Sequence, residues 1–249
     1  MVNMYSSEHS EFILSPLIDV LKNCISACRG IEDGIESFPL CEYVVQSLFL
    51  KLTGAQEQKM RCICWDIATL DYEYRYEFLN SRKYGEYSDL DSKKGVYNDL
   101  IRAIQKADNS FEPSHLFNTA FLSRILDEIM VIYENCIFNV WLSRDYIFYM
   151  RNYRRAISIS QIAQPKQNGT YPLFQSSLKE IYDKIVYKHR NRCAHNTLSY
   201  QINKPDLDVL ANDDFEYDNY FFRYTILILI DSIFMTLFNK YLTLQPERV

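Results

Sequence analysis

The most apolar stretch of the sequence runs from Tyr224 to Phe238 and reads YTILILIDSIFMTLF. It is shorter than the ~20 apolar residues that a membrane span requires. An acidic residue, Asp231, also interrupts it. We therefore predict that this stretch belongs to a helix buried inside the protein, and we expect no membrane partner.

The composition favours helices over the rest of the chain. The 249 residues include 20 Tyr and 15 Phe but only 6 Gly and 7 Pro. Few residues that break secondary structure favour long helices over many short strands joined by turns. A chain of this length forms one large domain or two small ones. We therefore predict an all-α helical bundle.

Residues that interrupt the helical pattern set the bounds of the expected helices. Helices are predicted near residues 14–29, 39–53, 55–82, 93–107, 115–162, 173–196 and 214–241, with Gly54 ending the second and a bend near Ser143 in the fifth. Residues 71–77 alternate polar and aromatic side chains like a strand, but no breaker separates them from the preceding helix. Asp71 and Arg75 are spaced as a helical ion pair, so we predict helix there. The break at 108–113 separates an N-terminal helical region, 1–110, from a helical bundle, 115–245, although both can belong to one compact unit.

Charge and cysteine content limit the location and the partners. The net charge is −5, yet residues 144–192 contain ten Lys and Arg against three Asp and Glu. This segment, with an excess of seven positive charges, is either an anion-binding site or a solvated face. The sequence has no evident secretion signal, and its seven cysteines show no spacing typical of disulfides. We therefore expect a cytoplasmic protein with reduced thiols in its core, without a metal site.

One segment carries specific chemistry, the run Arg190-Asn191-Arg192-Cys193-Ala194-His195-Asn196. It resembles the signature of the HEPN superfamily, small helical domains common in prokaryotic toxins and antiviral systems. The signature is an Arg, usually a polar residue after it, and a His about five positions later. The resemblance covers about residues 115–241, and it implies a HEPN-like bundle. Many members of this family are endoribonucleases that need no metal or other cofactor.

The resemblance implies roles that suit the residue types. Cleavage of RNA by its own 2′-hydroxyl requires proton transfer, and His195 has a side chain suited to that step near neutral pH. Arg190 has a planar, permanently charged fork that suits the negative charge developing on phosphorus oxygens. Asn191 is expected to orient the phosphate or the imidazole. Lys188 and Arg192 either attract RNA phosphates or are solvated charges.

Several alternatives remain open at this stage. Arg190 can simply pair with Asp183, and His195 can be a helix-terminal residue favoured by the helix dipole. The protein can also be a non-catalytic HEPN-like module that binds nucleotides, RNA or other proteins.

Helix geometry bears on assembly. Positions five apart on a straight helix lie ~140° apart around its axis. Either the helix ends or distorts around residues 193–195, or a second subunit completes the site. We therefore expect RNA as substrate, a homodimer, and an antitoxin or defence-system partner.

Overall fold

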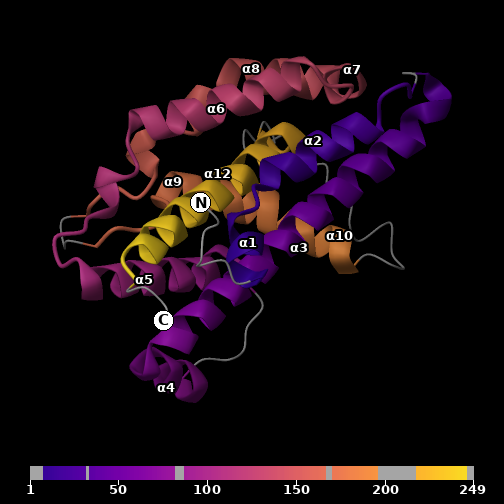
Figure 1. Cartoon of the computed structure of the whole chain (residues 1–249). Helices are drawn as coiled ribbons and strands as arrows, with labels where there is room; N and C mark the ends of the chain where they lie inside the picture. Colours follow the sequence, from indigo (N-terminus) through magenta and orange to yellow (C-terminus); the bar gives the residue numbers. More distant parts are fainter. Residues whose placement is uncertain (1–7, 32–33, 82–86, 167–169, 196–216, 246–249) are drawn as a thin grey trace, which may run out of the picture.

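A computed structural model describes residues 8–31, 34–81, 87–166, 170–195 and 217–245. Regular secondary structure in these residues is helical, and one isolated antiparallel bridge joins Ile162 to Phe174. The predicted all-α class is therefore confirmed for this part of the chain. The helices form a bundle of two long crossing helices with shorter helices around them (Figure 1).

The described elements are, in chain order, α1 (Glu8–Leu14), α2 (Leu17–Ala27), η1 (Ile35–Ser37), α3 (Phe38–Leu70), α4 (Tyr72–Ser81), α5 (Leu90–Ala107), η2 (Pro113–His115), α6 (Thr119–Glu134), α7 (Phe138–Trp141), α8 (Ser143–Ala156), η3 (Ile159–Gln161), α9 (Ser176–Ile181), η4 (Tyr182–Tyr187), α10 (Lys188–His195) and α12 (Tyr220–Thr243). The elements η1, η2 and η3 are short 3-10 turns, whereas η4 is a π-helix.

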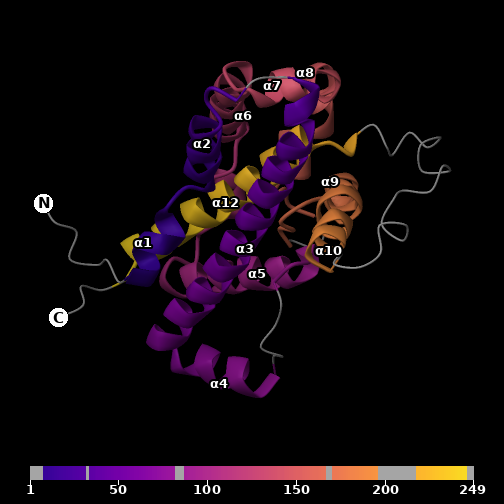
Figure 2. The same cartoon turned by 90° about the vertical axis from the view of Figure 1, so that its right-hand side faces the viewer.

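The apolar stretch at 224–238 lies within α12, at the centre of the bundle. Helices α1, α2, α3, α5, α6 and α8 all contact α12, so residues from both halves of the chain contribute to one continuous core (Figures 1 and 2). By length and composition α12 could cross a membrane, but most of its side chains are buried in the bundle. The predicted buried helix is confirmed.

Helix α3 crosses α12. The predicted helix end at Gly54 is wrong. It continues unbroken from Phe38 to Leu70. A glycine inside a helix costs only about 1 kcal/mol relative to alanine. Contacts of α3 with α1, α2, α5, α10 and α12 outweigh that cost, because tertiary packing supplies most of the stability of a helix in a protein. Gly54 therefore does not divide the helix.

The aromatic-rich run at 71–77 is helical, as predicted, but it belongs to a separate helix. Helix α3 ends at Leu70, and Asp71 adopts extended dihedral angles before α4 begins. The Asp71 carboxylate accepts the backbone N–H of Tyr74 and pairs with Lys106 of α5 at 2.5 Å. Arg75, its expected partner, instead lies over the Tyr72 ring. These contacts set the angle at which α4 leaves the bundle.

The other long predicted helices are also divided. Residues 119–156 form three helices, with the expected bend at Ser143, where α8 begins. Residues 176–195 form α9, η4 and α10 in direct succession, so the predicted helix here contains a π-helical segment. The buried Arg223 of α12 donates to the carbonyl of Ile185 at 2.9 Å, within that segment. A side chain that enters the backbone ladder is a recognised cause of such a distortion.

Candidate functional site

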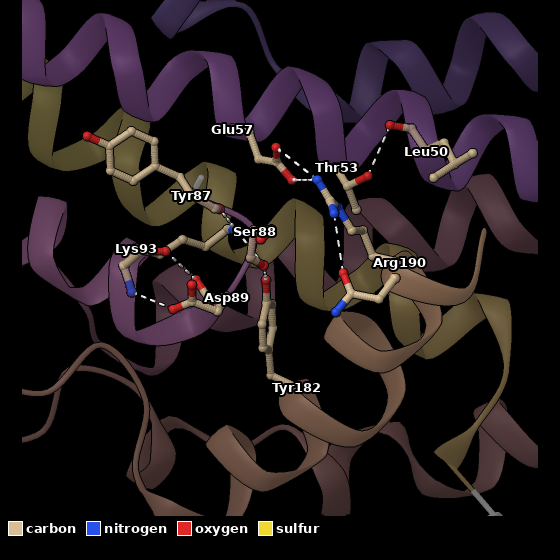
Figure 3. Close-up of polar contacts among 11 residues, drawn as sticks. Leu50, Thr53, Glu57, Tyr87, Ser88, Asp89, Lys93, Tyr182 and Arg190 are labelled. Atoms are coloured by element: carbon tan, nitrogen blue, oxygen red, sulfur yellow. Dashed lines mark hydrogen bonds and ion pairs between the residues drawn. The ribbon is translucent and has the colours of Figure 1, made fainter. Parts of the chain in front are cut away.

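The Arg190 side chain points from α10 toward α3 (Figure 3). Its Nη2 atom lies 3.3 Å from a carboxylate oxygen of Glu57, and its Nη1 donates to Oδ1 of the adjacent Asn191 at 3.2 Å. The side chains of Arg190 and Glu57 are 17% and 13% exposed. The guanidinium is therefore held in a fixed orientation at a partly open edge of the bundle. Among the described contacts, Arg190 pairs with Glu57 rather than with Asp183.

A buried lysine lies behind this ion pair. The Lys93 ammonium, at the start of α5, donates to the backbone carbonyls of Tyr87 and Ser88 (Figure 3). Burial lowers its pKa to about 8, while the negative charge of Glu57 opposes the shift and the positive charge of Arg190 adds to it. Lys93 and Arg190 thus both interact electrostatically with Glu57, and the carboxylate of Asp89 also acts on Lys93.

The π-helical segment η4 also contacts the residues around Lys93. The Tyr182 hydroxyl donates to the Ser88 carbonyl at 2.8 Å, and the Lys93 ammonium lies 5.6 Å from the centre of the Tyr182 ring. Burial raises the pKa of the Tyr182 hydroxyl, so this hydroxyl stays protonated. The continuous helical rod of α9, η4 and α10 carries Arg190. Tyr182 therefore connects this helical rod to the residues that precede α5. π-Helical turns are frequent at functional sites, where they change the direction of the side chains that follow.

The neighbouring side of α10, at His189, is packed rather than open. His189 lies half-buried, with Nε2 3.1 Å from the Tyr220 hydroxyl and its ring 4.9 Å from that of Phe49. Burial and the charges of Arg223 and Arg192 lower the pKa of this imidazole far below its ordinary value. His189 is consequently neutral near pH 7. It serves packing and is unsuited to exchanging protons at that pH.

The remaining predicted site residues lie in different surroundings. Arg192 lies near His189 and Asp218, at 3.4 and 3.7 Å, away from the contacts of Arg190. Lys188 is exposed at the start of α10. Asn191 is the one predicted partner whose side chain contacts Arg190 among the described residues. The His195 side chain and Asn196 lie outside the part of the chain that the structure describes.

The backbone of α10 bears on the geometry of Arg190 and His195. Helix α10 is α-helical from Lys188 through His195, and the distortion lies upstream in η4. The backbone positions of Arg190 and His195 are therefore ~140° apart around one regular helix. The described backbone shows no distortion at residues 193–195, and the described part of α10 ends at His195, so the alternative of a helix end near this point stays open.

Several cations of the basic segment at 144–192 form ion pairs with acidic side chains. Among the described residues, five of its ten cations pair with acids, and some of these acids come from α3, α5 and α6. The pairs are Arg154–Asp127, Lys179–Asp91, Lys184–Glu180, Arg190–Glu57 and Arg192–Asp218. Folding thus neutralises much of the charge that is concentrated in the sequence.

Sequence reasoning missed Glu57 and Lys93. Glu57 is 133 residues from Arg190, and nothing in its neighbourhood distinguishes it from other helical acids. Lys93 was expected only as the first residue of the predicted helix at 93–107, where lysines are usually solvated. None of the seven cysteines, all of which lie in the described residues, forms a disulfide, and five are buried and two half-buried. The described residues contain no group of three or more His, Cys, Asp or Glu arranged to hold a metal ion.

Comparisons of the chain with protein-family models, with curated proteins and with solved structures found no match. The resemblance to the HEPN superfamily rests on the motif at residues 190–196 and on its position. The motif begins in α10, at the end of a helical rod, and the next described helix is the buried α12.

Proposed function

We propose that this protein is a metal-independent endoribonuclease of the HEPN type, which cleaves RNA by attack of a 2′-hydroxyl on the adjacent phosphate. The observation that carries the proposal is the Arg190 guanidinium, which Asn191 and Glu57 orient at a partly exposed edge beside the rest of the motif. An oriented guanidinium suits a transition state in which negative charge grows on the phosphate oxygens. Orientation before binding lowers the reorganisation that the reaction requires.

The proposed roles follow from the donor groups. Arg190 has five N–H donors, of which the described contacts use some on Nη1 and Nη2. The others remain to bind phosphate oxygens. His195 moves a proton, either from the attacking 2′-hydroxyl or to the leaving 5′-oxygen. Asn191 accepts a hydrogen bond from the Arg190 guanidinium and holds it in one orientation, so Asn191 acts as a positioning residue.

Glu57 acts as a positioning residue that also competes with substrate. Without RNA, its carboxylate neutralises the half-buried Arg190. A phosphate that binds the remaining donors of Arg190 shares the cation with Glu57. The neighbouring Lys93, with its pKa of about 8, is mostly charged at pH 7 and offsets the added negative charge.

The angular separation of Arg190 and His195 supports a site shared by two subunits. A two-fold axis beside α10 brings two copies of the motif into one groove, because such an interface is self-complementary. We therefore propose a homodimer in which residues 188–196 of both chains line the RNA groove. Mixing Arg190→Ala and His195→Ala subunits tests this arrangement. Partial recovery of cleavage supports a shared site, and a monomer that cleaves at full rate contradicts it.

The reaction class has a direct test. Purified protein should cleave RNA in excess EDTA and leave a 2′,3′-cyclic phosphate, or its opened form, and a 5′-hydroxyl. DNA and RNA with methylated 2′-oxygens should resist, because the nucleophile is missing or blocked. Cleavage of DNA, or complete dependence on Mg²⁺, assigns the protein to a different reaction class.

The second candidate function is a non-catalytic HEPN-like module that binds RNA, nucleotides or protein partners. The partly buried Arg190–Glu57 ion pair favours it, since a paired arginine can serve assembly alone. The same assay separates the two, because this module binds RNA without cutting it. In either case, the resemblance implies a role in a toxin or antiviral-defence system, with an antitoxin or another component of that system as partner.

A further inference from the structure

A cavity of about 630 Å³ lies between the second half of α3, helix α4 and Tyr87, which precedes α5. Cavities that bind small molecules typically measure about 300–1,000 Å³. Helix α4 lies at one end of the bundle, beside the C-terminal part of α3 (Figures 1 and 2). The cavity is separate from the contacts of Arg190.

The charged residues that line this cavity are both cationic. Arg61 comes from α3 and Arg75 from α4, and no Asp or Glu is among the described residues that line the cavity. Both arginines are exposed, and neither forms an ion pair with another described residue. Arg61 and Arg75 thus line one apolar space from different helices, and the Arg75 guanidinium also lies over the Tyr72 ring. Two arginines beside such a space favour a ligand with a phosphate or carboxylate group.

Aromatic side chains supply much of the remaining wall. Trp65 is 66% exposed, although its ring makes an edge contact with His9 of α1. Phe78 of α4 lies half-buried, and Tyr87 is buried with its hydroxyl 3.5 Å from the sulfur of Cys64. Aromatic rings beside arginines stack on flat ring systems, which aliphatic anions lack.

We propose that this cavity binds a nucleotide, with the base against Trp65 and Phe78 and the phosphate at Arg61 and Arg75. The combination of aromatic wall and paired cations matches the two parts of such a ligand. The nucleotide can be free or can belong to an RNA strand. The binding site itself does not depend on the ribonuclease activity proposed above, whereas the RNA strand as source does.

The position of the cavity along α3 makes the RNA source geometrically reasonable. Glu57, Arg61 and Trp65 follow one another at intervals of four residues, so they lie on one side of the helix. The eight helical steps from Glu57 to Trp65 span ~12 Å. In addition, the Tyr87 carbonyl accepts a hydrogen bond from Lys93, whose charge interacts with Glu57. A strand bound at Arg190 therefore has a nucleotide site within a few nucleotides along α3.

Tryptophan fluorescence tests the proposal directly. The chain has two tryptophans, so Trp141→Phe leaves Trp65 as the reporter. AMP should quench this fluorescence with saturation, while adenosine and inorganic phosphate bind at least about tenfold more weakly because each lacks one half of the ligand.

Arg61→Gln and Arg75→Gln should each weaken AMP binding at least about fivefold. Arg151→Gln, on exposed α8, is the matched control and should leave binding unchanged. Calorimetric titration of the unmodified chain replaces fluorescence if Trp141→Phe does not fold.

A second titration identifies the source of the nucleotide. Its ligand is a short RNA with methylated 2′-oxygens, which the proposed reaction cannot cut. AMP binding that depends on both arginines indicates a free nucleotide, and binding of the oligonucleotide alone with the same dependence indicates an RNA strand. The proposal is overturned if neither ligand binds, or if binding is the same in wild type, Arg61→Gln and Arg75→Gln. If the protein does not cleave RNA, by contrast, AMP should still bind in this cavity.

Discussion

Helix α3 carries two ion pairs that face different helices and differ in almost every physical respect. Lys59 pairs with Asp231 of α12 at 2.6 Å, and both side chains are 2% exposed. Glu57 pairs with Arg190 of α10 at 3.3 Å, and both side chains are partly exposed. Positions 57 and 59 lie ~200° apart around the helix. One helix thus presents a sealed pair, Lys59–Asp231, to the core. It presents an accessible pair, Glu57–Arg190, to the candidate site.

The sealed pair has contacts on several sides. Lys59 also donates to the Ser15 carbonyl, and the second carboxylate oxygen of Asp231 accepts the backbone N–H of Leu17 at 2.8 Å. The pair therefore joins α3, α12 and the start of α2. Burial raises the pKa of Asp231 and lowers that of Lys59, so desolvation opposes both charges. The accessible pair retains donors and an open edge, which suit it to a ligand rather than to the core.

The largest expected effect on stability concerns the sealed pair. Asp231→Ala leaves the Lys59 charge buried without its carboxylate, and such a change typically costs about 3–5 kcal/mol. Urea denaturation should show this loss in the free energy of unfolding. The double variant Lys59→Met/Asp231→Leu should recover much of it, because it removes both charges. A loss below about 1 kcal/mol in Asp231→Ala would show that the pair does not hold the bundle together.

A smaller effect concerns the packed side of α10 and depends on pH. The pKa of His189 is lowered in the folded state, so below its ordinary value near 6.5 the unfolded chain binds a proton that the folded chain excludes. Stability contributed by neutral His189 is present above this pH and decreases as pH falls. The loss approaches about 1.4 kcal/mol per pH unit. Unfolding of wild type and His189→Gln, compared between pH 7 and 5, measures it. Equal pH dependence in the two proteins contradicts the burial of a neutral imidazole.

The smallest expected effect concerns the accessible pair. Glu57→Gln removes the carboxylate that competes for Arg190, so uncleavable RNA should bind several-fold more tightly at low salt. The free energy of unfolding should change by only about 1 kcal/mol, because the pair is partly solvated. Glu180→Gln, which alters an exposed pair on the same helical rod, is the control and should not change binding. Weaker RNA binding by Glu57→Gln would show that Glu57 only orients Arg190.

Local sequence patterns predicted the helical class and the buried position of residues 224–238, because composition and apolar content act within one segment. The same reasoning ended a helix at Gly54, since the contacts that carry α3 through this residue come from distant helices. It also missed the π-helical segment, where the Arg223 side chain enters from α12. Fold class is thus largely local information, whereas the bounds and distortions of helices depend on tertiary contacts.

The candidate site shows the same limit. The motif at 190–196 is contiguous, so its residue types could be recognised directly. The contact of Asn191 with Arg190 is also local. Glu57 and Lys93 reach the site only through folding, and no spacing in the sequence connects them with Arg190. The carboxylate that sets the charge of the site was therefore beyond sequence reasoning.

The most direct test of the central claim, that Arg190 acts on the phosphate of RNA, is the single-turnover cleavage rate in excess EDTA. Arg190→Ala should lower this rate at least about 100-fold, on the scale of a lost electrostatic contact in the transition state, while the circular dichroism spectrum remains helical. The same loss is expected in a Glu57→Gln background, where no unpaired carboxylate remains, and His195→Ala should match it. Folded Arg190→Ala protein that cleaves RNA at a near-normal rate would contradict the account.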